Sequence, residues 1–417
     1  MPVLVWKLSV VQVLGFACLG LAVGVWLKRK LPVLDRLNIP AAIVGGLLFS
    51  LIVLVCRDRI VNLEPDLGLR DVLMVGFFTT IGMGASLRML KEGGAQVAIF
   101  FGFSVLVVVL QNLLGAAGAS LMGINPLVGI LSGSVALAGG PATALAFGQS
   151  FEQWGVAGAP AIGVAAAMFG IVVGGLIGGP VGGSLIGKFG LKPQAARPAG
   201  LPKAKSVAYP DDPEKPSASP MEDESEGETS SLMSTVVIIG FAMGLGAFFT
   251  GYLDPWLKAH GLALPAYIGA MIAASLLRNI DDVTGWFRIS QHTVDNVGEV
   301  ALNIFIVMAL MTLQLWTLVN LALPLLVLLL LQALLVWLVC RLALYFVMGR
   351  DYDAAVMCAG FCGFMMGTTA NALANMGVLT EKYGPAPRAY LVVPLVGAFL
   401  IDFANALIIT TMANFLR

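Results

Sequence analysis

The sequence predicts an all-α, polytopic membrane protein with two inverted repeats, each containing five transmembrane helices and one re-entrant hairpin. Three observations support this prediction. The 417-residue chain is 58% hydrophobic and only 12% charged, whereas a soluble protein carries about 25% charged residues. Two glycine-rich apolar segments recur at one constant spacing in the two halves. A proline-rich, acidic stretch separates these halves.

The first repeat, residues 1–190, contains five apolar stretches that are long enough to cross a bilayer, which takes about 20 helical residues. Its predicted spans are residues 8–26, 40–55, 72–90, 95–122 and 161–186. The second span starts at Pro40, and proline suits a helix N-terminus. A hairpin at about 125–150 precedes the fifth span. Gln111 and Asn112 lie within the fourth span and either line a polar path or pair across helices.

Residues 191–231 differ in composition from the rest of the chain. They hold seven prolines and the acidic run that begins at Glu222. Low hydrophobicity combined with many prolines and charges leaves too little apolar surface to order a segment. We therefore predict a flexible linker between the two repeats.

The second repeat, residues 232–417, follows the same plan as the first. Its predicted spans are residues 233–253, 264–277, 297–315, 321–347 and 389–413, with a hairpin at about 354–376 before the last span. An odd number of crossings in each half inverts the second half relative to the first.

The two hairpins are predicted from matching glycines. A spacing of 227 residues separates Gly133 from Gly360 and also Gly140 from Gly367. Glycine disfavours a continuous helix and lets the backbone approach other groups closely. Glycine-interrupted segments at corresponding places in two halves indicate the binding site of a transporter. The alternative is a pair of ordinary packed helices, because small residues also mark helix contacts.

The distribution of positive charge predicts the orientation of the chain. With both termini outside, the inner side holds about 18 of the 24 lysine and arginine residues. This orientation places the linker in the cytoplasm and the N- and C-termini in the periplasm. The first hairpin then starts from the outside and the second from the inside, so their tips can meet near the middle of the membrane.

The hairpin tips supply the candidate site. Hard cations prefer oxygen ligands, broken helices expose backbone carbonyls, and helix N-termini attract anions. Predicted substrate-binding residues are Gly139, Gly140, Thr143, Gly367, Thr368, Thr369 and Asn371. Predicted sodium-binding residues are Ser132, Ser134, Asn375, Asp402 and Asn405. Asp402 is included because an acid inside a membrane span is a functional candidate, while any serine or threonine can instead bond its own helix.

Several sequence motifs resemble the bacterial sodium/glutamate symporter family, which is related to the 2-hydroxycarboxylate transporters. The resemblance covers nearly the whole chain. It rests on Val44–Leu48 with Ile39–Pro40, Leu69–Asp71, Gly174–Pro180, Met308–Met311, Asp351–Val356 and Leu391–Pro394. It implies Na⁺-coupled uptake of L-glutamate, an inner-membrane location, and a homodimer that moves substrate by an elevator-type motion.

The sequence departs from this family's pattern within the hairpins. Pro141 and Ala142 follow Gly139–Gly140, whereas the family's sequence at these positions is similar to Gly-Gly-His-Gly-Thr. Phe361 stands where the family has histidine. Alternatives are therefore a sodium- or proton-coupled symporter of another small carboxylate or amino acid, and, in a different class, an ion channel. Neutral net charge indicates no nucleic-acid partner. No catalytic motif is present, so we expect no enzyme.

Overall fold

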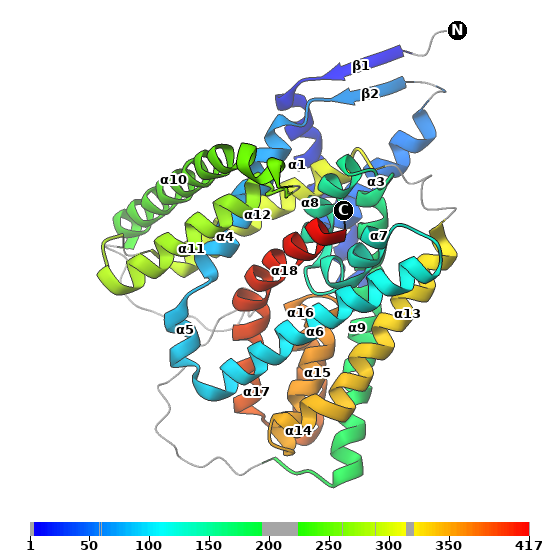
Figure 1. The fold of residues 1–417 in the computed structure, drawn as a ribbon, viewed down its shortest axis with the longest axis vertical. Coiled ribbons are helices and arrows are strands. Elements are labelled where there is room, and N and C mark those ends of the chain that lie inside the picture. The colour runs from blue at the N-terminus through cyan, green and yellow to red at the C-terminus, as the bar shows by residue number, and fades with distance from the viewer. Residues whose placement is uncertain are drawn as a thin grey trace.

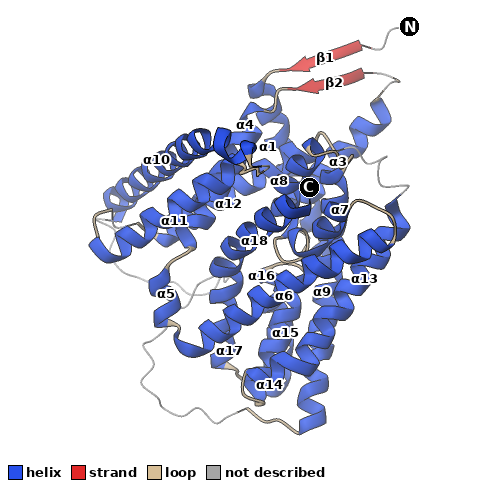
Figure 2. Ribbon diagram, in the orientation of Figure 1, coloured by secondary structure: helices blue, strands red, loops and turns tan. Residues whose placement is uncertain are grey.

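The computed structural model describes residues 4–193, 224–313 and 321–416, apart from residues 58, 60, 261 and 288. This part of the chain is almost entirely helical (Figures 1 and 2). Most of the predicted linker, at 194–223, lies outside the described residues, and a helix already begins at Glu224.

The elements of the first half run from the N-terminal strand to the long helix α9. They are β1 (Leu4–Leu8), α1 (Val10–Lys30), α2 (Pro32–Arg36), α3 (Ala41–Cys56), β2 (Val61–Pro65), α4 (Gly68–Gly84), α5 (Leu87–Glu92), α6 (Gly94–Leu121), α7 (Pro126–Ile130), the π-helical turn η1 (Leu131–Val135), α8 (Gly140–Gln153) and α9 (Ala159–Phe189).

The elements of the second half run from α10 to the C-terminal helix α18. They are α10 (Glu224–Ala259), α11 (Ala266–Thr284), α12 (Gln291–Leu310), α13 (Ala322–Val339), η3 (Cys340–Leu344), α14 (Tyr345–Val347), α15 (Tyr352–Met366), α16 (Thr369–Tyr383), α17 (Pro387–Leu395), η4 (Val396–Leu400) and α18 (Ile401–Leu416).

Ten spans were expected, and the described residues contain seven helices that are long and apolar enough to cross a membrane. Helices α17 and α18 add an eighth if they form one span, which is bent by 40°. The expected second span is α3, whose 16 residues reach about 24 Å and fall short of a bilayer core of about 30 Å. The expected seventh span is α11, which carries Arg278, Asp281 and Asp282 in its C-terminal part and is therefore less apolar.

The all-α prediction is wrong at the N-terminus, where two short strands pair in parallel. Leu4 pairs with Val61, and the register continues to Leu8 and Pro65. Each strand has five residues, and β1 leads into α1 and β2 into α4, so the strands form a ribbon at one end of the molecule (Figure 2). Five residues are too few to give a clear alternating pattern beside such strong helical signals.

The helices pack as two groups that do not coincide with the two halves of the chain. The first helix group consists of α1, α3, α4, α10, α11 and α12, which pack mainly against one another. The hairpin group consists of α6, α7–α9, η1 and α13–α18 with η3 and η4. Each half therefore contributes its first three long helices to the first helix group and the rest to the hairpin group. In Figure 1, α10, α11, α4 and α12 lie along one side of the molecule.

Glycines allow very close helix crossings in both groups. A Cβ atom built on Gly45 of α3 would lie 1.9 Å from the Gly20 carbonyl oxygen of α1. A Cβ atom built on Gly170 of α9 would lie 2.2 Å from the Met366 carbonyl oxygen, at the end of α15. These helix backbones are therefore in direct contact, as small residues permit between helices in membranes.

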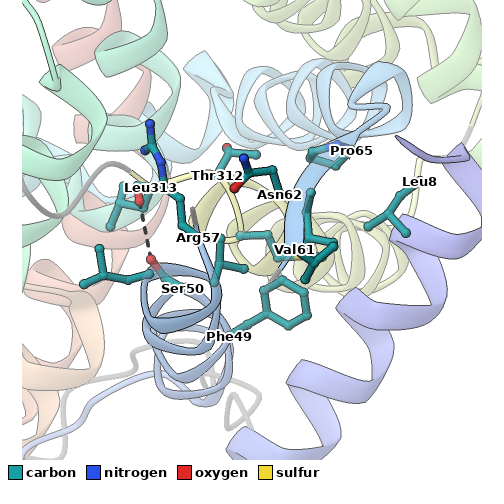
Figure 3. Close-up of a pocket in the computed structure, with 13 residues that line it drawn as sticks. Leu8, Phe49, Ser50, Arg57, Val61, Asn62, Pro65, Thr312 and Leu313 are labelled. Carbon is teal, nitrogen blue, oxygen red and sulfur yellow. Dashed lines mark hydrogen bonds between the residues drawn. The ribbon is translucent and has the colours of Figure 1, made fainter. Parts of the chain in front are cut away.

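A cavity of about 290 Å³ lies within the first helix group, between the strand ribbon and the C-terminal ends of α3 and α12 (Figure 3). The Ser50 hydroxyl donates a hydrogen bond to the Leu313 carbonyl across its base at 3.5 Å. None of the predicted site residues lines this cavity.

Candidate functional site

Both predicted hairpins contain broken helices. In the first hairpin, Gly133 has φ −91° and ψ −129°, which are not helical angles, and α8 starts afresh at Gly140 with φ +70°. In the second hairpin, α15 ends at Met366, Gly367 has φ −158° and ψ −102°, and α16 begins at Thr369. The chain therefore leaves the helical conformation at the glycines that the sequence singled out.

The tips of the two hairpins meet. A Cβ atom built on Gly140 would lie 3.6 Å from the carbonyl oxygen of Gly367, although the two residues are 227 positions apart in the chain. The constant spacing seen in the sequence therefore corresponds to a contact in space.

The helix ends at the tips have opposite polarity. Helices α8 and α16 both begin there, and α15 ends there. The Thr368 hydroxyl caps α16 by accepting a hydrogen bond from the Asn371 amide at 3.3 Å. Pro141 occupies the first turn of α8, where its missing N–H costs no hydrogen bond. Amide groups with partial positive charge and carbonyl groups with partial negative charge are thus brought together at one place.

A buried polar network holds the break of the first hairpin. The Ser134 hydroxyl donates to Asn405 Oδ1 of α18 at 2.7 Å, and Asn405 Nδ2 donates back to the Ser134 carbonyl at 3.1 Å. The Ser134 amide donates to Asn112 Oδ1 of α6 at 3.1 Å. Helix α6 therefore satisfies the Ser134 N–H beside the break at Gly133, and α18 satisfies the Ser134 hydroxyl, while the Ser134 carbonyl also accepts from the Ala138 and Gly139 amides.

A second amide on α6 holds the other hairpin. Gln111 Nε2 donates to the Met365 carbonyl of α15 at 3.0 Å, and Gln332 Nε2 of α13 donates to the Gln111 carbonyl at 2.7 Å. The adjacent residues Gln111 and Asn112 thus connect α6 to both hairpins. Of the two alternatives predicted for them, the structure shows pairing across helices. Gln332 was not predicted, although an amide within a long apolar helix was a usable signal.

The polar side chains of the second hairpin bond to the adjacent helices. Asn371 Nδ2 donates to the Ile171 carbonyl at 2.7 Å, and Asn375 Nδ2 donates to the Gly174 carbonyl at 2.9 Å. The Thr369 hydroxyl donates to the Gly397 carbonyl at 2.9 Å. The second hairpin is therefore bonded to α9 on one side and to η4 on the other.

Several buried oxygens at this centre lack a hydrogen-bond donor within the described part of the chain. They are Gln111 Oε1, Gln332 Oε1 and Asn371 Oδ1. A buried polar atom without a partner is costly. These oxygens are the kind of group that a bound cation or water satisfies.

Asp402 lies on α18 between the two hairpin contacts of the last span. It follows Gly397, which accepts from Thr369, by five residues, and it precedes Asn405, which bonds Ser134, by three. The side chain is half-buried and makes no hydrogen bond or ion pair with the residues described. Its carboxylate is therefore available to a ligand.

Four of the five predicted sodium ligands already have hydrogen bonds in this structure, since Ser134 and Asn405 bond each other and Ser132 and Asn375 bond backbone carbonyls. The Ser132 hydroxyl donates to the Val128 carbonyl of its own hairpin arm at 2.9 Å, as the alternative interpretation supposed. The Asn375 amide nitrogen is used by Gly174, which leaves its oxygen for another donor or an ion.

Phe361, at the position where the family resemblance leads us to expect histidine, lies away from the hairpin tip. Its ring packs against Phe100 and Phe103 of α6 and against Phe364, with ring centres 5.3–6.0 Å apart. It precedes Gly367 by six residues, or about 9 Å along a helix. Phe361 therefore contributes to the packing between α6 and α15 and does not lie at the tip.

The acidic, histidine and cysteine side chains of the described residues form no cluster of three or more that could hold a metal ion. The cysteines are free, and Cys340, Cys358 and Cys362 are buried where α13 and η3 pack on α15. The groups that meet around the tips are backbone, hydroxyl and amide oxygens. Such a ligand set suits a hard cation.

The fold and the site define a class of protein. Multi-pass helical proteins whose broken helices meet at a buried polar centre, with opposite helix ends pointing at it, are secondary transporters. The model of the sodium/glutamate symporter family matches residues 6–385. The chain therefore belongs to the sodium/glutamate symporter family.

Similar proteins from bacteria extend over nearly the full length. The sodium/glutamate symporter of Escherichia coli (strain K12) is 38% identical over 407 residues, which cover 97% of each chain. That of Haemophilus influenzae is 34% identical over 405 residues and 96% of each chain. Among solved structures, a sodium proton antiporter from Methanocaldococcus jannaschii is 15% identical, with a TM-score of 0.39 over 97% of this chain and 94% of the other. A likeness at this score does not define the fold.

Proposed function

We propose that the protein is a sodium-coupled symporter that carries L-glutamate into the cell across the bacterial inner membrane. Family membership and the names of the similar proteins support both the substrate and the coupling ion. The observation that carries the proposal is the contact between the tips at Gly140 and Gly367. It brings two broken helices from different halves of the chain to one site.

The two ligands would use opposite ends of the broken helices. The substrate's carboxylates would bind at the N-terminal ends of α8 and α16, where amide N–H groups and the helix dipole favour anions. This substrate site comprises Gly139, Gly140, Thr143, Gly367, Thr368, Thr369 and Asn371. Na⁺ would bind beside it, at oxygens of Ser132, Ser134, Asn375, Asp402 and Asn405.

The packing of the helices supports an elevator-type motion. Both hairpins belong to the hairpin group, so the whole site can move against the first helix group without being taken apart. The helix order of the two halves supports inverted repeats, with re-entrant hairpins that start from opposite sides. We further propose that the protein works as a homodimer, with periplasmic termini and a cytoplasmic linker.

The energy available depends on how many Na⁺ ions move with each substrate. Moving one net charge through 100 mV yields about 2.3 kcal/mol. Glutamate with one Na⁺ is electroneutral and draws only on the sodium gradient. Two Na⁺ ions add the membrane potential as a second source.

The test is uptake of radiolabelled L-glutamate by the purified protein in proteoliposomes. We expect accumulation driven by an inward sodium gradient, none with potassium in its place, and exchange of labelled for unlabelled glutamate in counterflow. Unlabelled aspartate, glutamine, citrate and malate added as competitors define the substrate. Uptake driven equally well by a proton gradient, or flux without counterflow, would contradict the proposal.

A further inference from the structure

A wide cavity separates the first helix group from the first hairpin. It measures about 950 Å³ and lies between the N-terminal turn of α4, the start of α11 and the side of α8. We call it the vestibule. It reaches Ala146 of α8, which is six residues, or about 9 Å along the helix, from the tip residue Gly140. The vestibule therefore borders the C-terminal half of α8, the helix that leads to the tip of the first hairpin.

A narrower cavity continues from the vestibule. It measures about 50 Å³ and lies among α8, α9 and the end of α12. Arg70 of α4 and Gln149 of α8 line both cavities. These two side chains, one from each helix group, therefore lie where the two cavities join, and Glu152 of α8 also lines the narrower one, where its Oε1 accepts from the Gly158 amide at 3.2 Å.

Arg70 is the one cationic side chain lining either cavity among the residues described. Its side chain is 15% exposed, and its Nε and Nη2 atoms both donate to a single oxygen, Asp71 Oδ1, at 3.0 and 2.8 Å. A guanidinium has five N–H donors in a planar fork, so the side of the fork facing away from Asp71 remains usable.

The position of Arg70 is not explained by the stability of α4. Arg70 is the third residue of the helix, and a positive charge near a helix N-terminus is unfavourable. Its partner Asp71 is 54% exposed, and ion pairs with an exposed partner contribute little stability. A carboxylate ligand can therefore replace Asp71 at the guanidinium at small cost.

We propose that Arg70, assisted by the Gln149 amide, is a recognition site that selects anionic substrate by binding one of its carboxylates in the vestibule, before the substrate reaches the hairpin tips. This inference rests on the proposed function. The vestibule also contains Asp71 and Asp254, so its charge does not attract anions from a distance. Recognition therefore depends on direct, charge-assisted hydrogen bonds from the guanidinium.

The test compares Arg70→Gln and Arg70→Lys with the wild-type protein in proteoliposomes at saturating Na⁺. Loss of a charge-assisted bond predicts a KM for glutamate about ten- to a hundredfold higher in Arg70→Gln. Arg70→Lys, which keeps the charge but not the fork, should show a smaller rise. The Na⁺ concentration for half-maximal uptake should stay within about twofold of wild type, since the contact is with substrate alone.

The matched control is Arg278→Gln. Arg278 is a similarly buried arginine of the first helix group, with 12% exposure and a bond to Asp282 at 2.9 Å, near the opposite end of α11 from the vestibule. Its loss should leave the KM unchanged. Asp71→Asn removes the competing carboxylate and should lower the KM. If the KM rises as much in Asp71→Asn as in Arg70→Gln, then transport requires the Arg70–Asp71 ion pair itself. That result would overturn the proposal.

The wild-type arm separates this inference from the proposed function. Wild-type protein that takes up no anionic substrate on a sodium gradient contradicts both. Wild-type protein that takes up glutamate, with a KM in Arg70→Gln within twofold of wild type, refutes the role of Arg70 alone. If Arg70→Gln fails to insert or fold, the KM of Arg70→Lys decides. We then expect a rise of at least threefold, and any smaller rise refutes the role of Arg70.

Discussion

Asp402→Asn is expected to weaken the dependence of transport on Na⁺ far more than it weakens folding. Asp402 lies about 7.5 Å along the last span from Gly397 and about 4.5 Å from Asn405, at 1.5 Å per residue, and these two residues bond the two hairpins. Asp402 therefore lies, along the axis of the last span, between the contacts with the two hairpins, and the proposed Na⁺ site places its carboxylate on the ion. Because the described structure gives Asp402 no hydrogen bond or ion pair, asparagine removes charge without removing a structural contact.

The magnitude follows from the loss of one charge beside a bound ion. Two unit charges about 4 Å apart attract by about 4 kcal/mol at an effective dielectric constant of 20. Asparagine retains one ligand oxygen, and dehydration of the carboxylate offsets part of the attraction, so we expect a loss of about 1.5–3 kcal/mol. This corresponds to a Na⁺ concentration for half-maximal uptake that is about ten- to a hundredfold higher. The free energy of unfolding should change by less than about 1 kcal/mol.

The assay is initial glutamate uptake in proteoliposomes as a function of Na⁺ concentration, with thermal unfolding in detergent measured on the same preparation. Glu299→Gln is the matched control, because Glu299 is an exposed acid on α12 of the first helix group. Asn405→Leu is the structural comparison. It leaves the buried Ser134 hydroxyl without its partner, while the Ser134 carbonyl keeps the Ala138 and Gly139 amides, so it should lower stability by about 1–3 kcal/mol. An unchanged sodium response in Asp402→Asn would remove Asp402 from the site and refute the reasoning.

Two further predictions concern glycines. Gly45→Ala should destabilise the protein by about 1–3 kcal/mol or more, because its Cβ would lie 1.9 Å from the Gly20 carbonyl oxygen. The control is Gly15→Ala, whose Cβ would have nothing within 4 Å and which should leave the stability unchanged. Equal melting temperatures of the two variants would contradict this prediction. Gly140→Ala should cost about 1–2 kcal/mol through its φ of +70°, since its Cβ would have ordinary 3.6 Å contact with Gly367; an unchanged unfolding temperature would show that the backbone relaxes there.

Element type and position were largely predictable because they depend on local pattern. The stretch 95–122 became α6 at Gly94–Leu121, within a residue at each end, whereas the stretch 297–315 became α12 at Gln291–Leu310, which is displaced by five or six residues. The breaks at Gly133 and Gly367 followed from the low helix propensity of glycine. The strands β1 and β2 were missed because their pairing joins residues more than 50 positions apart, and five-residue segments carry little periodic signal.

The contacts of the candidate site were less predictable because they depend on tertiary packing. The sequence showed that Gln111 and Asn112 lie in a span, but not that one holds each hairpin. Gln332 is bonded to a carbonyl 221 positions away, and no local pattern encodes such a partner. Arg70 is part of the Leu69–Asp71 motif on which the family resemblance rests, yet its place near Gln149 follows from how α4 and α8 border the same two cavities.

The mixed composition of the two helix groups has a consequence for biosynthesis. The ribosome delivers α4 long before α11, and α6 long before α18, although these helices are neighbours in the finished protein. Neither group is complete when the first 190 residues have been made. The helix faces of the first half that pack on helices of the second half therefore have no partner in the bilayer until the second half is synthesised. A gene cut within the linker would therefore yield two fragments that each lack half of both groups, and only their joint insertion could restore the fold.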